Sequence, residues 1–156
     1  MKKQKNRWIM LFCICCNTFC FGGVYAWSAF SGELANYMGW DYSKVTVAYS
    51  IMLMCVALMG LVGGMLLQRF GARKLMIAAG IMWGLGWFAT GMAGSIIMLY
   101  ASFGILAGCA SGFGYNPGVV TAVSWFPDKK GFASGMAVGT CGMASLIVAP
   151  LANFLL

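Results

Sequence analysis

The side chains in this sequence that could take part in chemistry are mainly hydroxyls, amides and thiols. Histidine is absent, and the three acidic residues, Glu33, Asp41 and Asp128, lie outside the long apolar stretches. No nucleophile therefore stands beside a plausible base, which argues against an enzyme. Nucleotide-binding motifs are also absent, so an ATP-driven pump is not indicated. We expect neither a catalytic residue nor a cofactor.

The thiols are equally unpromising as a metal site. Seven cysteines occur at positions 13, 15, 16, 20, 55, 109 and 141, all within apolar stretches. Cys13 and Cys16 have the spacing of half a zinc site, but no second pair and no histidine could complete it. Cysteine in such surroundings behaves as a small hydrophobic residue. We expect packing or lipid-facing thiols and no bound metal.

The composition places these groups in a membrane. Of the 156 residues, 62% are hydrophobic and 8% charged, and the mean hydropathy is +0.85, whereas soluble domains carry about 25% charged residues. Abundant glycine (22) with scarce proline (3) suits closely packed helices better than a transmembrane barrel. The sequence therefore predicts an all-α polytopic membrane protein.

Five apolar stretches are long enough to cross a bilayer, which takes about 20 residues. The predicted spans are residues 8–30, 45–67, 75–92, 96–123 and 131–155, in a single membrane domain over 1–156. Residues 31–44 would form the first outer loop and residues 93–95 the second. A cleavable signal peptide is the competing interpretation of the first stretch.

The cations mark one side of the membrane. Nine of the ten fall in three clusters between alternate spans: Lys2, Lys3, Lys5 and Arg7; Arg69, Arg73 and Lys74; Lys129 and Lys130. This is the positive-inside pattern rather than a nucleic-acid footprint. It predicts a multi-pass protein of the plasma or inner membrane with a cytoplasmic N-terminus, and no nucleic-acid partner.

Glycines recur every four residues in the last two spans. The two series are Gly104, Gly108 and Gly112, and Gly131, Gly135 and Gly139. Residues four apart share one helix face, so each series makes a groove that another backbone can approach. General helix packing is a commoner use of such a groove than a dedicated dimer interface. Both helices are expected to be among the most tightly packed.

The turn between the second and third spans carries a recognisable pattern. Residues 63–75 read GGMLLQRFGARKL, and this segment resembles the loop signature G-x-L-x-D-R-x-G-x-R of the major facilitator superfamily. Gly64, Leu66, Arg69, Gly71 and Arg73 match, whereas Gln68 replaces the aspartate. The segments GVYAWSAFSGEL and GFGYNPGVVTAVSWFPDKKGFASGMAVG resemble the oxalate/formate antiporter branch, which is close to the monocarboxylate transporters.

The resemblance implies a secondary transporter built of two six-helix halves, with its substrate held between them near the middle of the membrane. This chain would supply helices 1 to 5 of the N-terminal half, truncated after helix 5. In that branch the cations that pair with a carboxylate lie mainly in the second half, and the spans predicted here contain no charged residue. The expected function is transport of small organic anions by a larger protein, with this chain inactive alone. The alternative is a non-transporting remnant or helper subunit that packs against another membrane protein.

The resemblance also implies which residues face the substrate, because helices 1 and 4 line the central cavity in the superfamily. Tyr25 and Tyr115 rank first, since a phenol can donate a hydrogen bond while its ring forms a wall, although such tyrosines are as often packed core residues. Trp27 lies about 200° around the helix from Tyr25 and is a weak candidate. The remaining candidates are polar residues of the same two helices: Asn17, Thr18 (unless it bonds back to its own helix) and Asn116 beside Pro117.

The signature turn is expected to anchor the topology and to latch the cytoplasmic ends of helices through Arg69 and Arg73. Gln68 weakens the second role, because the aspartate that it replaces would pair with a cation or a helix N-terminus.

Overall fold

The computed structural model describes residues 7–155 as a bundle of helices. The first helical segment of the bundle comprises α1 (Arg7–Phe21), the 3-10 segment η1 (Gly22–Ala26) and α2 (Trp27–Met38), with no turn between them. The following elements are α3 (Tyr42–Phe70), α4 (Ala72–Gly91), α5 (Ile96–Leu99), the π-helical segment η2 (Tyr100–Ala107), α6 (Gly108–Trp125), the 3-10 turn η3 (Pro127–Lys129) and α7 (Lys130–Leu155). Within the described range no residue is in a β-strand, which confirms the all-α fold.

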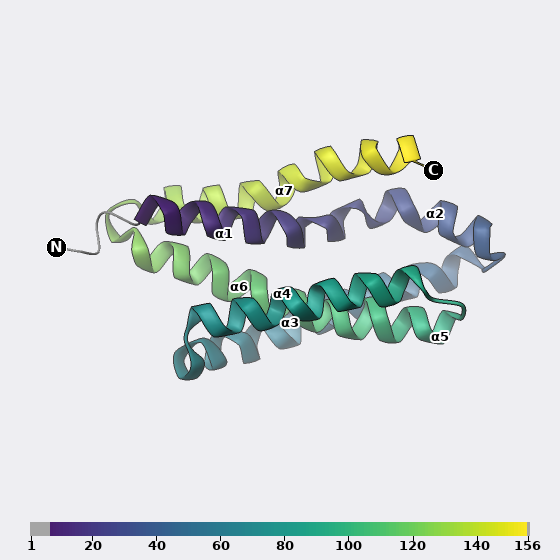
Figure 1. The fold of residues 1–156 in the computed structure, drawn as a ribbon, viewed down its shortest axis with the longest axis horizontal. Helices are drawn as coiled ribbons and strands as arrows, with labels where there is room; N and C mark the ends of the chain where they lie inside the picture. The colour runs from purple at the N-terminus through teal and green to yellow at the C-terminus, as the bar shows by residue number, and fades with distance from the viewer. Residues whose placement is uncertain (1–6, 156) are drawn as a thin grey trace.

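The long helices run back and forth between two ends of an elongated bundle (Figure 1). One end, here called the Gly71 end, holds the N-terminal side of α1, the α3–α4 turn and η3. The opposite end, the Gly39 end, holds the α2–α3 and α4–α5 turns and the last turn of α7. Consecutive long segments are therefore antiparallel neighbours or near neighbours.

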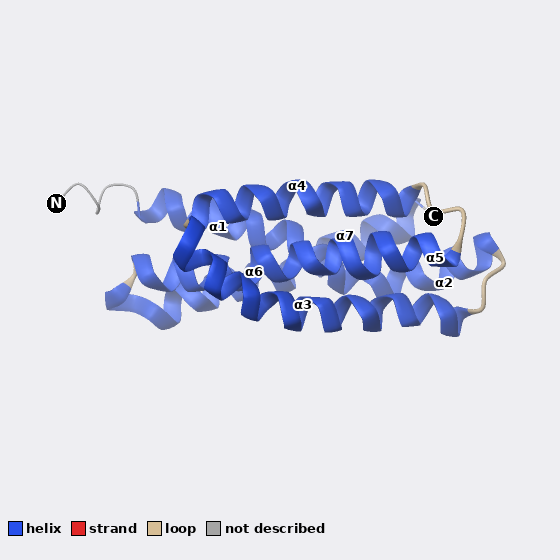
Figure 2. Cartoon of the chain, turned by 90° about the horizontal axis from the view of Figure 1, so that it is seen from below, coloured by secondary structure: helices blue, strands red, loops and turns tan. Residues whose placement is uncertain are grey.

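Among the described residues, four helical segments are long and apolar enough to cross a membrane: Arg7–Tyr25, Tyr42–Phe70, Ile96–Trp125 and Pro127–Val148. The protein is thus polytopic. The predicted third span corresponds to α4, which is not among these four and carries Arg73 and Lys74 in its first turn. Its 20 residues nevertheless reach about 30 Å, the thickness of a hydrocarbon core. It lies beside α3 and α6 (Figure 2), and a five-span topology stays a prediction.

The expected first outer loop, residues 31–44, is wrong over most of its length. Helix α2 continues to Met38, and α3 starts at Tyr42, so residues 39–41 make the whole connection. Gly39 takes a positive φ of 64°, which glycine adopts without steric cost. The Asp41 Oδ1 then accepts a hydrogen bond from the Ser43 backbone N–H at 3.1 Å and caps α3. Polar residues alone did not reveal that this stretch is helical.

The basic turn is even tighter than the sequence suggested. Gly71 is the single non-helical residue between α3 and α4, and its φ is 79°. Because a side chain is strained at that φ, glycine is needed to end one helix and start the next. Arg69 and Arg73 consequently lie on helices rather than on a loop.

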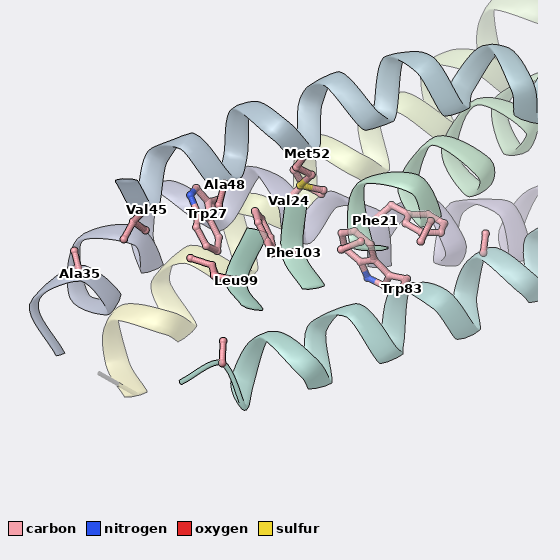
Figure 3. Packing of buried hydrophobic residues seen from close by; sticks show 14 residues of the cluster. Phe21, Val24, Trp27, Ala35, Val45, Ala48, Met52, Trp83, Leu99 and Phe103 are labelled. Carbon is pink, nitrogen blue, oxygen red and sulfur yellow. The ribbon is translucent and has the colours of Figure 1, made fainter. Parts of the chain in front are cut away.

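The bundle buries two clusters of apolar residues. The larger surrounds Trp27, Phe103, Phe21 and Trp83 near the middle and the Gly39 end (Figure 3). The smaller includes Ile14 and Phe126 toward the Gly71 end, and its other buried members are Leu11, Cys15, Ala122, Ala133 and Ala137.

Many large apolar side chains point outward instead, as a membrane protein requires. Leu61, Ile97 and Leu146 are each more than 70% exposed. In water such surface would favour aggregation, but hydrocarbon solvates it.

The two glycine series behave differently. A Cβ at Gly108 would lie 2.8 Å from the Cβ of Cys55 and 3.0 Å from the Met52 carbonyl oxygen, and one at Gly112 would lie 2.9 Å from the Val56 carbonyl oxygen. These glycines, with Gly104, therefore let α3 approach the η2–α6 segment closely.

The series on α7 does not pack in this way. No atom lies within 4 Å of a Cβ built at Gly131, Gly135 or Gly139. Helix α7 instead turns a row of small residues inward: Ala133, Ala137, Cys141 and Ala144. The two rows are offset by two positions, about 200° around the helix. Tight packing through the α7 glycines was the wrong expectation for the described part of the chain.

Candidate functional site

Two tyrosines from distant parts of the sequence line the same cavities. Tyr25 comes from η1 and Tyr115 from α6. Both line a cavity of about 280 Å³, to which α7 contributes Val138, Cys141, Gly142 and Ser145. Both also line a smaller space of about 80 Å³ that Ser111 and Cys141 share. The structure therefore brings together the two residues that ranked first in the sequence.

Close helix contacts build this region. A Cβ at Gly22 would overlap the Cys141 carbonyl and the Ala144 side chain, and one at Gly114 would overlap the Phe21 ring. Glycine at these positions allows α7 to approach η1 and allows α6 to approach α1. These close contacts bring the segments that carry Tyr25 and Tyr115 to the same cavity.

The chemistry of these cavities is polar but uncharged. The hydroxyls of Tyr25 and Tyr115 can donate hydrogen bonds, whereas that of Ser145 already donates to the Gly142 carbonyl oxygen at 2.7 Å. No Asp, Glu, Lys or Arg is among the lining residues of either cavity. Aromatic and aliphatic groups form the rest of the walls. Such a site can bond to an oxygen atom of a ligand but supplies no countercharge.

A third cavity continues from Tyr25 toward the Gly39 end. Its volume is about 230 Å³, and its lining residues are Tyr25, Trp27, Ser28, Ser31, Tyr42, Thr46 and Tyr49. We call it the Trp27 cavity. Six of the seven lining side chains carry a hydroxyl, and none carries a charge.

Trp27 and Tyr25 lie on different sides of their segment, as the two-residue offset predicts. Tyr25 is 55% exposed, whereas Trp27 is only 5% exposed and stacks on Phe103 with ring centroids 3.9 Å apart. Trp27 is thus mainly a core residue, although one edge of it reaches the cavity that it shares with Tyr25.

The other candidates on the two helices are less well placed. Thr18 is fully buried, and its Oγ1 donates to the Ile14 and Cys15 carbonyls, both at 3.1 Å, so its hydroxyl serves its own helix. Asn116 is exposed, and its side-chain amide packs against Gly60 of α3 instead of facing the tyrosines. Asn17 lies near Gly118 of α6, and its buried Oδ1 has no hydrogen-bond partner among the described residues.

The signature turn makes no ion pair with another described residue. Gln68, Arg69 and Arg73 are exposed, and the Arg69 guanidinium lies 5.8 Å from the centre of the Phe70 ring. Open space surrounds a Cβ at Gly64. The one ion pair found among residues 7–155 joins Arg7 to Asp128 at 3.6 Å, elsewhere at the same end.

Sequence reasoning missed several lining residues. The sequence predicts a packing or lipid-facing thiol at Cys141 and gives no reason to select Ser111 or Ser145. Cys141 and Ser145 are four residues apart and so share a helix face. This spacing was the sequence feature that could have identified them as residues lining one cavity. For Tyr42, Thr46 and Tyr49 of α3 a similar three- to four-residue spacing was present in the sequence.

Antiparallel apolar helices of membrane-crossing length define a polytopic membrane protein, and uncharged cavities around Tyr25 lie between its helices. The sequence pattern of the Major Facilitator Superfamily matches residues 7–156. The chain belongs to this superfamily of transporters.

Individual relatives agree with this assignment. An uncharacterized MFS-type transporter of Escherichia coli (strain K12), YhjX, is 36% identical over 92% of this chain and 36% of its own length. The oxalate:formate antiporter of Oxalobacter formigenes is 32% identical over 97% of this chain and 36% of its own length. Monocarboxylate transporter 3 of Mus musculus is 28% identical over 95% of this chain and 30% of its own length. The chain thus spans about a third of the length of these curated relatives.

Proposed function

We propose that this chain is part of a secondary transporter for small organic anions of the oxalate/formate or monocarboxylate type, and that it is inactive alone. The observation that carries the proposal is the convergence of Tyr25 and Tyr115 on one uncharged cavity. Their hydroxyls are suited to orient a carboxylate, because a hydrogen bond to a charged acceptor is stronger than one to a neutral acceptor. The names of two relatives, an oxalate:formate antiporter and a monocarboxylate transporter, support this substrate class.

The missing countercharge supports the second part of the proposal. Tight binding of an anion in a low-dielectric cavity needs a cation nearby, and the lining residues of the three described cavities around Tyr25 include none. We propose that helices outside this chain, in a second half, supply that charge. Tyr25 and Tyr115 would then position the anion.

Proteoliposomes test this division of roles. Purified chain alone should not accumulate labelled oxalate, formate or lactate. A chimera in which this chain replaces the aligned part of the Oxalobacter formigenes antiporter should restore uptake. Tyr25→Phe and Tyr115→Phe in the chimera should each lower uptake about 10-fold or more through loss of a hydrogen bond to a charged group.

The control is Tyr37→Phe, because Tyr37 is 86% exposed and lies outside the cavities around Tyr25. Saturable uptake by the chain alone would overturn the claim that it is inactive alone. A folded chimera in which neither tyrosine substitution changes uptake would overturn the role of the tyrosine cavity.

The runner-up is a non-transporting membrane component. The outward glycine row of α7, Gly131, Gly135 and Gly139, favours it, because that row has no neighbour among the described residues. Such a component would leave the chimera inactive while still associating with another membrane protein.

A further inference from the structure

We infer that the Trp27 cavity is a second carboxylate-binding subsite, in which the Trp27 Nε1–H and the Tyr42 and Tyr49 hydroxyls donate to carboxylate oxygens. The inference rests on the proposed function and extends it, because it assigns a site separate from the cavity that Tyr25 shares with Tyr115. The ligand class is a small carboxylate, which suits a space of about 230 Å³.

The strongest observation is an unmet hydrogen-bond donor. Trp27 is 5% exposed, and its Nε1 is buried with no partner among the described residues. An indole nitrogen can only donate, and a buried donor without an acceptor is costly and rare. In Figure 3 the Trp27 nitrogen lies at the ring edge turned toward α3, the helix that supplies Tyr42, Thr46 and Tyr49 to the cavity. An acceptor in this cavity would satisfy it.

The ring is held in place by its neighbours. It stacks on Phe103 with an interplanar angle of 18°, and Phe103 is fully buried. Trp27 therefore cannot easily turn its nitrogen toward another acceptor. The donor is positioned before any ligand arrives, which reduces the entropic cost of binding.

The remaining groups of the cavity divide into two kinds. Ser31 donates to the Ser28 carbonyl at 3.4 Å and Thr46 to the Tyr42 carbonyl at 3.0 Å, so both hydroxyls are already used within their helices. The hydroxyls of Tyr42 and Tyr49 make no such bond to described residues and stay free to donate. With no acidic or basic lining residue, the cavity presents an excess of neutral donors, which matches a ligand rich in acceptors.

The Trp27 cavity adjoins the cavity that Tyr25 shares with Tyr115. Tyr25 lines both the Trp27 cavity and the cavity of Tyr115. Tyr42 stands at the start of α3, at the Gly39 end. A carboxylate bound beside Trp27 would therefore lie between that end of the bundle and the Tyr25–Tyr115 cavity.

Indole resonances offer a direct test on the full chain. The 156-residue protein, labelled with ¹⁵N-tryptophan and placed in lipid nanodiscs, has six indole N–H signals. Trp27→Phe assigns one of them by its loss while keeping a ring to stack on Phe103. Sodium formate and sodium oxalate are then titrated against sodium chloride at equal ionic strength.

Because the cavity offers neutral donors and no countercharge, binding to this chain alone should be weak. We expect the Trp27 signal to move with formate or oxalate in a saturable manner and to stay unmoved by chloride. Tyr49→Phe should weaken the apparent affinity roughly 3- to 10-fold, the effect of removing one hydrogen bond. Tyr37→Phe should leave the affinity unchanged, since Tyr37 is 86% exposed and lines a different cavity, which Trp27 shares with the acidic residue Glu33. Unchanged positions of the other five indole signals show that a variant is folded.

Three results overturn the inference, and they differ in what they say of the proposed function. If carboxylate moves other signals but not that of Trp27, the subsite is wrong while anion binding stands. If chloride moves Trp27 as much as carboxylate does, the cavity holds any small anion and the assignment fails. If no signal moves with any carboxylate, the subsite is wrong and the chain contributes no detectable anion binding of its own.

Discussion

Single residues in this protein act mainly through the side of the helix on which they lie. Trp27 and Tyr25 are two positions apart, yet one is stacked in the core and the other is 55% exposed at three cavities. Likewise Gly112 lies against α3, whereas Gly139 has open space around it. Residue type alone does not predict whether such a residue packs in the core or lies in open space. Substitutions of the same residue type on different helix faces are therefore informative.

Gly112→Ala and Gly139→Ala form such a pair. A Cβ at Gly112 would lie 2.8 Å from that of Met59 and 3.0 Å from the Gly60 backbone nitrogen, so α3 must shift. We expect Gly112→Ala to lower the free energy of unfolding by about 1–3 kcal/mol, as overpacking does.

Gly139→Ala is the matched control and should be neutral or slightly stabilising, because alanine favours helix more than glycine. Unfolding in mixed micelles with increasing sodium dodecyl sulfate, followed by tryptophan fluorescence, measures both. Equal losses at the two sites would contradict the packing described for α3 and α6.

At the scale of elements, the two long central segments depart from regular α-geometry. The 3-10 segment η1 interrupts the first, and the π-helical η2 interrupts the segment from Ile96 to Trp125. Such irregularities often mark functional regions. Here η1 carries Tyr25 to the cavities, and η2 carries Phe103 under Trp27. Both lie around the sites proposed for the anion.

A long-range hydrogen bond fastens η2 to the start of α3. The Tyr100 hydroxyl donates to the Lys44 carbonyl oxygen at 2.9 Å, across 56 residues of sequence. Tyr100→Phe should therefore lower the free energy of unfolding by about 0.5–1.5 kcal/mol. Tyr37→Phe, at an 86% exposed position, should not change it. Hydrogen exchange at the first turn of α3 should quicken in Tyr100→Phe, and unaltered exchange there would count against the tie.

At the scale of the whole molecule, charge separates the two ends of the bundle. The described cations at the Gly71 end are Arg7, Arg69, Arg73, Lys74, Lys129 and Lys130, whereas Lys44 shares the Gly39 end with Glu33 and Asp41. By the positive-inside rule the Gly71 end should face the cytoplasm. Lys2, Lys3 and Lys5, which were part of the same prediction, lie outside the described residues.

Single added cysteines test this orientation. Gly94 lies in the exposed α4–α5 turn and Arg73 near the exposed α3–α4 turn, at opposite ends. A membrane-impermeant maleimide should label Gly94→Cys in intact cells and Arg73→Cys only after the membrane is opened. The parent chain, whose seven cysteines lie in helices, is the background control. Labelling of Gly94→Cys from the cytoplasmic side alone would reverse the topology.

The sequence by itself determined the class of fold, the approximate positions of the long helices and the family. These follow from apolar length, from the grouping of cations and from the signature around Gly71, all of which are local in sequence. It also pointed to Tyr25 and Tyr115, through their place in the spans matched to the superfamily. It could not determine that residues 31–38 are helical, because their polar groups are compatible with either a loop or a helix beyond the hydrocarbon.

Only the tertiary structure decided which faces meet. The glycine row of α7 and the alanine and cysteine row behind it are both made of small residues, and contact with η1 and α1 selects the second. The unmet Trp27 donor and its neighbours Tyr42 and Tyr49 likewise become one site only when α2 folds back against α3. Helical periodicity states which residues share a face, but the neighbour of that face depends on long-range packing.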